Sequence, residues 1–317
     1  MIDRIRPAIG ALLPETVKRR LSPPKSPRPD AGPYTYLQGL MIDNYQVRNL
    51  VGVDPLQFRQ RIEGFLALED AEMEGYVAPE MQRAKSVRFR WPYDHDFGDF
   101  QVGPGKANHR PSRLLSTFMR RFDALPKSLD GQRVLDIGCY TGGTSLLLAA
   151  MGASVVAVEE VTKYVDCLRY LRDSFALENL DPRNLSLYDL TTDEFQDAFD
   201  IVLFSGVLYH LSDPVLGMRI TFNAVRPGGR CLLETAAAKS NARILDYAGK
   251  NDPGRGGGAN WFYPSPLVVS EMMDEVGYCD IRSIVQPNPR HDRVLAVGTK
   301  VAQVDMLRAG LSVRTIR

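Results

Sequence analysis

The chain has 317 residues, 44% of them hydrophobic and 24% charged, and its formal net charge is +1. This composition is ordinary for a globular protein, and the near-zero net charge excludes a chain whose overall field attracts nucleic acid. The four cysteines have no CxxC spacing, and no apolar run approaches the roughly 20 residues of a membrane span. We therefore expect a cytoplasmic protein with reduced cysteines, no structural zinc and no membrane contact.

The N-terminal part is predicted to be a tail followed by a helical cap. Residues 1–33 are rich in Pro and Arg, which predicts a flexible tail. Asp54 and Pro55 supply an N-cap and a first-turn proline before apolar residues at helical spacing, so about 35–78 should be helical. A cap that covers the substrate is expected over residues 34–125. Its other elements are a short strand, a polar turn and a helix, at Val87–Tyr93, Asp94–Gly98 and Ser112–Phe122.

From Gly131 the chain alternates between apolar strands and amphipathic helices, which predicts a doubly wound α/β sheet over residues 126–302. The last two strands are too closely joined for a crossover helix and predict an antiparallel hairpin. A C-terminal tail follows at residues 303–317. The seven strands are expected at Arg133–Ile137, Val155–Val158, Leu185–Leu187, Phe199–Phe204, Arg230–Glu234, Tyr278–Val285 and Arg293–Gly298. The helices are expected at Thr144–Ala150, Thr162–Phe175, Pro214–Val225 and Pro266–Glu275, with a turn at Arg226–Gly229.

The most informative segment joins the first strand to the first helix of this pattern. It is Asp136-Ile137-Gly138-Cys139-Tyr140-Thr141-Gly142, an acid followed by a glycine-spaced turn. Glycine has no Cβ, so such a turn lets the backbone approach a ligand closely. Glu159 ends the next strand, 17 residues beyond Gly142, where an acid can bind both hydroxyls of a ribose. An adenosine-containing cofactor is therefore expected at these strand ends.

The loop also indicates which cofactor. A nicotinamide fingerprint needs glycine where this loop has Tyr140, because the backbone must cradle a diphosphate. Asp136 would repel phosphate but would attract the ammonium group of an amino acid. One acid for a ribose and one for an ammonium together predict S-adenosylmethionine.

With these residues established, the chain resembles the class I S-adenosylmethionine-dependent methyltransferases over about residues 131–301. The motifs that carry the resemblance are Asp136-Ile137-Gly138-Cys139-x-x-Gly142, Glu159, Asp189 and Asp200-Ile201-Val202. Three segments are similar to the branch that includes the tRNA wobble-uridine carboxymethyltransferases, namely Phe204–His210, Leu233–Thr235 and Asn260–Pro266. The resemblance implies a Rossmann-like methyltransferase sheet beneath the N-terminal helical cap.

The resemblance also implies roles for individual residues. Gly138 would pack under the methionine part, Glu159 or its neighbour Glu160 would hold the ribose, and Asp189 with Leu190 would flank the adenine. Tyr140 departs from the usual glycine, and would either fold over the cofactor or close off the pocket. The full set of expected cofactor contacts is Asp136, Gly138, Cys139, Tyr140, Thr141, Gly142, Glu159, Glu160, Asp189, Leu190, Ser205 and Tyr209.

In the wobble-uridine branch, a tyrosine faces the reactive carbon of the cofactor, and an arginine binds the extra carboxylate of carboxy-S-adenosylmethionine. Tyr209 and Arg293 match these two residues. The lysine and tryptophan that the branch uses before the glycine loop have no evident counterpart, because the equivalent stretch is Asn108-His109-Arg110.

Methyl transfer depends mainly on holding an acceptor in line with the sulfonium, and an alcohol or phenol acceptor also needs a base. His210 and His95 are the candidate bases, and Tyr209 is a catalytic contact because its aromatic face can stabilise the cationic sulfur. Substrate contacts are expected from His109, Arg110, Trp261 and Arg293. No metal is expected at Asp94-His95-Asp96, because successive side chains of a strand point to opposite faces and the three cannot converge on one ion.

The sequence thus favours methyl transfer to an oxygen or nitrogen of a small-molecule or sugar-like acceptor. Two alternatives stay open. One is a tRNA-modifying enzyme that grips phosphates through the basic segment Arg83–Arg121. The other is a cofactor-binding partner protein without catalysis.

Overall fold

The computed structural model describes residues 32–67, 89, 91–103, 110–249 and 260–302. Its central sheet comprises β3 (Arg133–Ile137), β4 (Ser154–Glu159), β5 (Leu180–Asn184), β6 (Phe199–Ser205), β7 (Val225–Ala237), β10 (Cys279–Gln286) and β11 (Asp292–Thr299). The strand order is β10-β11-β7-β6-β3-β4-β5. The middle strands are parallel, whereas β11 is antiparallel to both β7 and β10. The expected seven-stranded, doubly wound sheet with an antiparallel C-terminal hairpin is confirmed.

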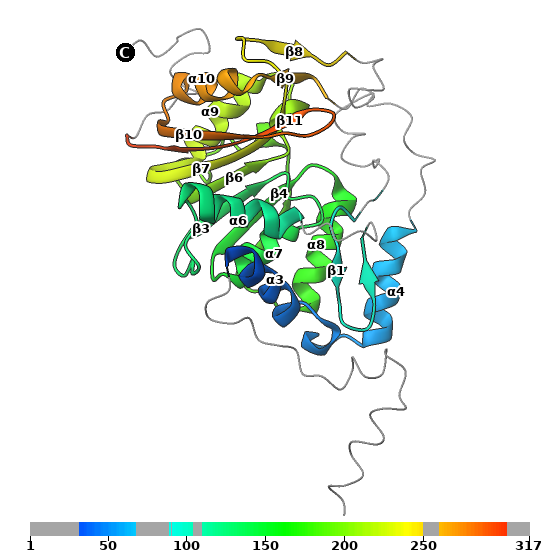
Figure 1. The fold of residues 1–317 in the computed structure, drawn as a ribbon. Coiled ribbons are helices and arrows are strands. Elements are labelled where there is room, and N and C mark those ends of the chain that lie inside the picture. Colours follow the sequence, from blue (N-terminus) through cyan, green and yellow to red (C-terminus); the bar gives the residue numbers. More distant parts are fainter. Residues whose placement is uncertain (1–31, 68–88, 90, 104–109, 250–259, 303–317) are drawn as a thin grey trace, which may run out of the picture.

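Helices cover both faces of the sheet (Figure 1). They are α3 (Pro33–Asn44), α4 (Pro55–Leu66), α6 (Arg110–Phe122), α7 (Gly143–Ala150), α8 (Thr162–Ser174), α9 (Pro214–Ala224) and α10 (Pro266–Glu275). Three 3₁₀ turns accompany them, η1 (Val47–Asn49), η3 (Leu187–Asp189) and η4 (Leu208–His210). Two short ribbons lie outside the sheet, β1 (His95–Asp96) with β2 (Gln101–Val102), and β8 (Leu245–Tyr247) with β9 (Phe262–Pro264). None of the described helices is long and apolar enough to cross a membrane.

Successive side chains of the central strands enter two different cores, because a strand points alternate residues to opposite faces. On β6, Ile201 and Leu203 join the core formed with α3, α6, α7 and α8, whereas Val202 and Phe204 join the core formed with α9 and α10. Fully burying each such side chain contributes about 1.5–3 kcal/mol. The strands whose ends carry the candidate site are therefore held in place by packing on both faces of the sheet.

The cap packs on the face of the sheet that α7 and α8 cover. As expected, Asp54 caps α4: its carboxylate accepts hydrogen bonds from the backbone N–H groups of Leu56 and Gln57. The Tyr45 hydroxyl donates to the Leu146 carbonyl at 2.6 Å and ties the end of α3 to α7. The cap is thus joined directly to the helix that follows the glycine loop.

The prediction of a third strand at Leu185–Leu187 is wrong. The strand is β5, which begins five residues earlier, and the segment after it forms η3. Pro182 lies inside β5, which made the segment look like a loop in sequence. β5 is an edge strand that pairs with β4, and an edge strand tolerates proline because one side needs no N–H donor.

Two further predictions are corrected. The predicted strand Val87–Tyr93 lies partly outside the described residues, and its described part, Phe89 and 91–93, is not a strand. The strand is β1, inside the stretch that was expected to be a polar turn. The predicted turn Arg226–Gly229 is the first part of β7, which continues straight from the end of α9.

Candidate cofactor and acceptor site

The candidate site lies at the carboxyl ends of the parallel strands. Ile137 of β3 is in register with Val158 of β4 and Phe204 of β6, so the loops after these strands begin at the same level. Ser205 is in register with Glu234 of β7. Ligands of doubly wound sheets bind in the crevice at this edge.

Two glycines shape the loop after β3. Gly138 and Gly142 have φ values of +71° and +81°, a region that favours glycine. A Cβ on Gly138 would lie 2.3 Å from Val207 Cγ2, and one on Gly142 would lie 2.2 Å from Leu168 Cδ1. The glycines therefore let this loop approach the loop after β6 and helix α8, which is a packing role in addition to the expected ligand contact.

Tyr140 stands between these glycines and adopts the left-handed backbone that a glycine would take there, with φ +56°. Its ring stacks on Tyr164 of α8 at 4.0 Å between centroids, and the Tyr164 hydroxyl donates to the Tyr140 hydroxyl at 2.7 Å. The left-handed conformation costs roughly 1–2 kcal/mol for a residue with a Cβ. The stack on α8 offsets this strain, and the Tyr140 N–H donates to Glu159 Oε2 at 3.0 Å.

Asp136 is 2% exposed, and its Oδ2 accepts hydrogen bonds from the hydroxyls of Thr144 and Ser145, both at 2.6 Å. Burial raises the pKa of this carboxyl to about 6. Among the described residues no hydrogen bond reaches Oδ1, and the buried Thr141 hydroxyl also lacks a partner. A buried acid and an orphaned hydroxyl in one loop fit an ammonium and a carboxylate, the two ends of an amino acid.

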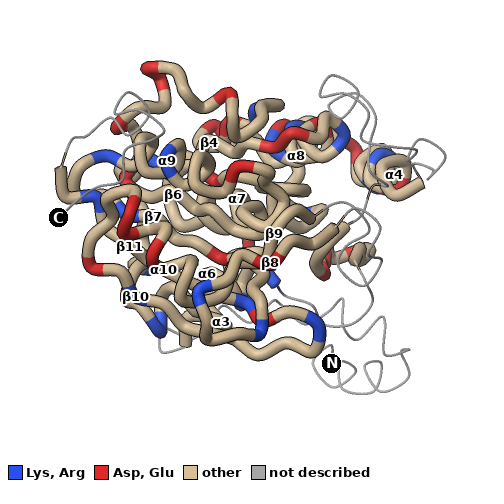
Figure 2. The backbone as a smooth tube through the Cα atoms, turned by 90° about the horizontal axis from the view of Figure 1, so that it is seen from above, with Lys and Arg blue, Asp and Glu red and all other residues tan. Residues whose placement is uncertain are grey.

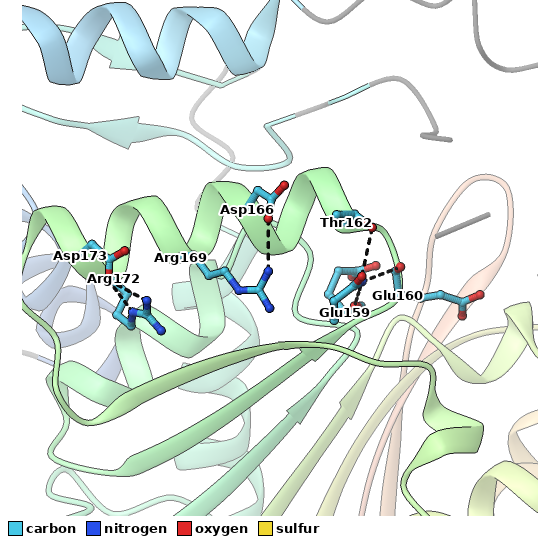
Figure 3. A network of polar contacts seen from close by, with 8 residues as sticks. Glu159, Glu160, Thr162, Asp166, Arg169, Arg172 and Asp173 are labelled. Atoms are coloured by element: carbon cyan, nitrogen blue, oxygen red, sulfur yellow. Dashed lines mark hydrogen bonds and ion pairs between the residues drawn. The ribbon is translucent and has the colours of Figure 1, made fainter. Parts of the chain in front are cut away.

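Glu159 is 8% exposed, and both of its carboxylate oxygens accept backbone hydrogen bonds, from Tyr140 and from Val161. Burial raises the pKa of this carboxyl to about 7. A carboxylate has about four acceptor sites, so about two remain, as many as a ribose diol has hydroxyls to donate. Glu160 points in a different direction (Figure 3), and its Oε2 accepts from the Ser186 hydroxyl at 3.3 Å. The geometry therefore favours Glu159 for the ribose.

Sequence reasoning missed Asn184, which fixes the backbone at the end of β4. Its Nδ2 donates to the carbonyls of Glu159 and Glu160, at 3.0 and 2.8 Å, and its Oδ1 accepts from the Thr162 hydroxyl at 3.0 Å. Asn184 ends β5, so it could not be placed once that strand was misplaced. The correct position of β5 would have set a polar residue beside Glu159.

The two residues expected at the adenine have local roles in the structure. Asp189 accepts from the Ser186 N–H at 2.8 Å and completes a capping box on η3. Leu190 is buried in the core that α9 and α10 cover. Adenine contact by either residue stays a prediction.

The second functional residue missed from sequence is Glu234, whose side chain is buried among polar groups from three other segments. The Ser205 hydroxyl donates to its Oε2 at 3.1 Å, Arg293 forms an ion pair with Oε1, and Arg110 Nη2 lies 3.7 Å from Oε2. Arg293 Nη2 is buried and lacks a hydrogen-bond partner among the described residues. An acid near the carboxyl end of the fifth strand was the signal that could have identified Glu234.

Tyr209 and its neighbours line the mouth of the site. The Arg293 guanidinium lies over the Tyr209 ring at 5.2 Å, and the exposed His210 ring is 4.1 Å from it. The backbone N–H of Trp261 donates to the Tyr209 carbonyl at 2.9 Å, and Trp261 is 45% exposed. The structure thus brings together five of the residues expected for catalysis and substrate, Arg110, Tyr209, His210, Trp261 and Arg293, whereas His109 lies outside the described residues.

His95 does not lie with these residues, and the structure gives no support for a catalytic role. It is 2% exposed, its Nε2 is 3.1 Å from the Tyr45 carbonyl, and its ring stacks on Phe97 at 3.8 Å. Burial lowers its pKa to about 4, so the ring is neutral. His95 instead packs beside Trp91 and Tyr93, which belong to the core that α3, α6, α7 and α8 cover. Within the described ranges no cluster of three or more His, Cys, Asp or Glu could hold a metal.

A doubly wound sheet with a glycine loop and two buried acids at its strand ends defines the class of S-adenosylmethionine-dependent methyltransferases. A family model described as a methyltransferase domain matches residues 107–282, more than half of the chain, and the chain belongs to this family. This family match supports methyl transfer, with S-adenosylmethionine as the methyl donor that the site is expected to bind.

Two relatives and one solved structure illustrate the similarity. A tRNA U34 carboxymethyltransferase of Desulfotalea psychrophila is 28% identical over 169 residues, 51% of this chain and 51% of that protein. A ubiquinone biosynthesis O-methyltransferase of Xanthomonas campestris pv. campestris is 30% identical over 170 residues, 54% of this chain and 66% of that protein. This chain therefore spans about half of the first relative and less than two thirds of the second. The N-terminal domain of EvdMO1, solved in the presence of SAH and D-fucose, shares the fold with a TM-score of 0.53, at 16% identity over 78% of this chain and 97% of that domain.

The loop can be tested at Tyr140. Tyr140→Gly is expected to weaken the binding of S-adenosylhomocysteine by about 3- to 10-fold, because it removes a ring stack of about 0.5–1.5 kcal/mol and loosens the N–H that faces Glu159. Isothermal titration calorimetry measures the change. Tyr140→Phe keeps the stack and should bind almost like the wild type. Equal affinities of the Gly variant and the wild type would show that the ring only fills space.

Proposed function

We propose that the chain transfers a methyl group to an oxygen or nitrogen of a small-molecule or sugar-like acceptor, with a hydroxyl oxygen as its preferred nucleophile. The observation that carries the proposal is a pair of aromatic rings at this edge of the sheet: Tyr209 and Tyr263 are nearly parallel, and Arg293, the ion-pair partner of the buried Glu234, lies over the Tyr209 ring. Aromatic faces of this kind stack on the flat ring of a small acceptor. The similarity to ubiquinone biosynthesis O-methyltransferases agrees with an oxygen acceptor.

In this proposal each group at the strand ends has one task. Asp136 binds the ammonium of the cofactor and Glu159 its ribose diol, and both acids keep the cofactor fixed while the acceptor approaches. The Tyr209 ring faces the cationic sulfur. The cap, residues 34–125, excludes water above the site and belongs with the sheet domain, residues 126–302. S-adenosylmethionine supplies an electrophilic methyl group.

A transfer assay tests the proposal. Purified protein is incubated with S-adenosylmethionine carrying a tritiated methyl group and with phenols, glycosides, aromatic amines and unmodified tRNA in separate reactions. Tritium in an ether of a phenol or glycoside is the expected result. Label in tRNA alone would overturn the proposal. Transfer to none of the acceptors would favour the non-catalytic cofactor-binding protein.

The second candidate is a tRNA wobble-uridine carboxymethyltransferase, and one observation favours it. Arg293 Nη2 is a buried donor without a partner among the described residues, and it could donate to the extra carboxylate of carboxy-S-adenosylmethionine. Against it, Glu234 already neutralises Arg293, and charges of both signs are interspersed along α8 and the neighbouring surface (Figure 2). The basic residues Arg83, Lys85, Arg88, Arg90 and Lys106 lie outside the described residues.

Mass spectrometry of the ligand that the protein retains on purification separates the two candidates. S-adenosylmethionine or its demethylated product is expected. The carboxylated form would favour the tRNA candidate, and tRNA binding that weakens steeply with salt would support it further, because phosphate contacts release counterions.

A further inference from the structure

His291 is a histidine that the family resemblance did not assign, and the topology brings it to the candidate site. It directly precedes β11, which runs antiparallel to β7, so the start of β11 lies at the edge where the parallel strands end. Two residues further on, Arg293 is in register with Ala236 and contacts Glu234. His291 therefore lies at the same edge as Ser205 and Tyr209.

The His291 ring packs face to face on Tyr263 of β9, with 4.0 Å between centroids and 14° between planes. Tyr263 is itself fixed, because it is buried and its hydroxyl accepts from Asn260 Nδ2 at 2.6 Å. The Tyr209 ring is nearly parallel to Tyr263, at 6.4 Å and 12°. Tyr209 of η4, Tyr263 of β9 and His291 of the β10–β11 turn thus form one continuous row of rings, the aromatic wall.

The turn that carries His291 is also held in place. Lys239 Nζ donates to the Pro289 carbonyl at 3.0 Å, and the Asn288 N–H donates to Asp292 Oδ1 at 3.3 Å. A partly exposed imidazole that is fixed by its ring and by its backbone is preorganised, which is what a group that must meet a substrate requires. If the His291 ring only packed against Tyr263, an apolar ring such as that of phenylalanine would do the same.

We propose that the partly exposed Tyr209 and His291, which pack on the buried Tyr263, form the acceptor subsite, in which a ring-bearing acceptor packs along the aromatic wall and donates its hydroxyl to a ring nitrogen of His291. The inference rests on the proposed hydroxyl acceptor and names the group that receives the proton. As the acceptor oxygen bonds to the methyl carbon, the electron pair of the carbon–sulfur bond goes to sulfur. The hydroxyl proton moves to His291, and the resulting imidazolium releases it to water.

His291 is preferred to His210 because its ring lies against the buried Tyr263, whereas His210 is exposed beside the outer ring, Tyr209. The two histidines provide a matched pair of variants. His291→Phe keeps a ring against Tyr263 but removes both nitrogens, so folding and cofactor binding should be retained. His210→Asn changes the histidine at the edge of the wall.

The chain has four histidines, His95, His109, His210 and His291, so their ring signals can be followed by NMR after selective ¹³C,¹⁵N labelling. The protein is saturated with S-adenosylhomocysteine, and catechol or methyl α-D-glucopyranoside is then added. The His291 signals, identified by their loss in His291→Phe, should shift with at least one probe, while those of the buried His95 stay fixed. If bound S-adenosylhomocysteine is demonstrated and neither probe moves His291, the subsite is wrong.

Kinetics with the hydroxyl acceptor found in the transfer assay give the second readout. At saturating S-adenosylmethionine, His291→Phe should lower kcat by about 100-fold or more and abolish the fall in kcat at low pH, because a general base contributes roughly 10²–10⁴-fold. His210→Asn, whatever its rate, should keep the fall in kcat at low pH, because the proton goes to His291. A His291→Phe enzyme with the wild-type rate and pH profile would overturn the inference. Label found only on tRNA would overturn the proposed function, and label found only on nitrogen would overturn the preference for a hydroxyl on which the inference rests.

Discussion

Glu159→Ala is expected to lower the affinity for S-adenosylhomocysteine by about 100-fold or more. The variant loses two hydrogen bonds to a charged group, each contributing about 1.5–3 kcal/mol. It also leaves the N–H groups of Tyr140 and Val161 without their acceptor, so the glycine loop and the turn after β4 lose a common anchor. Isothermal titration calorimetry at pH 8, where the Glu159 carboxyl is ionised in the wild type, measures the full effect.

The same carboxylate predicts a pH dependence of cofactor binding. Burial raises the pKa of Glu159 to about 7 in the free protein, and ribose hydroxyls that donate to it favour the ionised form. Binding must therefore release the proton below pH 7, and the affinity should fall by up to about tenfold per pH unit there, and level off above pH 7. Asp136, with a pKa of about 6, adds a further decrease at lower pH.

Glu160 provides the matched control for the Glu159 variants, because it neighbours Glu159 in sequence but its carboxylate accepts a hydrogen bond from the Ser186 hydroxyl. Glu160→Ala should change the affinity by less than about threefold, the effect of a partly exposed hydrogen bond. In Glu159→Gln the decrease just below pH 7 should become smaller, leaving the part that Asp136 causes at lower pH. If the two acids exchanged these outcomes, the ribose would be assigned to Glu160.

Residue patterns predicted the parts of the fold that are buried on both faces. β3, β4 and β6 are mostly apolar because helices cover both sides of them, and such runs are evident in sequence. β5 escaped detection because it lies at an edge and contains Pro182. β8 and β9 escaped because each has only three residues, too few for any periodicity.

The site divides in the same way. Asp136 and Glu159 were predictable because Glu159 ends an apolar strand and Asp136 is one residue from the end of another, and strand ends of a parallel sheet meet at one edge. The partners of Glu234 could not be predicted, because Arg110 and Arg293 come from a helix and a strand that only the fold brings together. The stack of His291 on Tyr263 has the same origin: no local pattern relates a turn residue to a ribbon that precedes it by one helix and one strand.

Lys300→Ala is expected to destabilise the fold by about 3–5 kcal/mol, the cost of removing one partner of a buried ion pair. Lys300 is fully buried just after β11; its Nζ lies 2.6 Å from Asp197 Oδ1, donates to the Phe222 carbonyl at 3.0 Å and lies over the Phe222 ring at 4.5 Å. At roughly 2 °C per kcal/mol for a large domain, the midpoint of thermal unfolding should fall by about 6–10 °C.

The double variant Lys300→Met with Asp197→Asn shows whether the loss comes from the charge. Methionine restores most of the volume and asparagine removes the carboxylate, so the double variant should be more stable than Lys300→Ala although both lack the ion pair. Lys300 follows the end of β11 opposite to Arg293, so the affinity for S-adenosylhomocysteine should stay within about twofold of the wild type, below the ~1 kcal/mol of one hydrogen bond. A parallel loss of affinity and stability would mean that the two ends of β11 are coupled. Equal stability of Lys300→Ala and the wild type would mean that the ion pair only balances the cost of burying its charges.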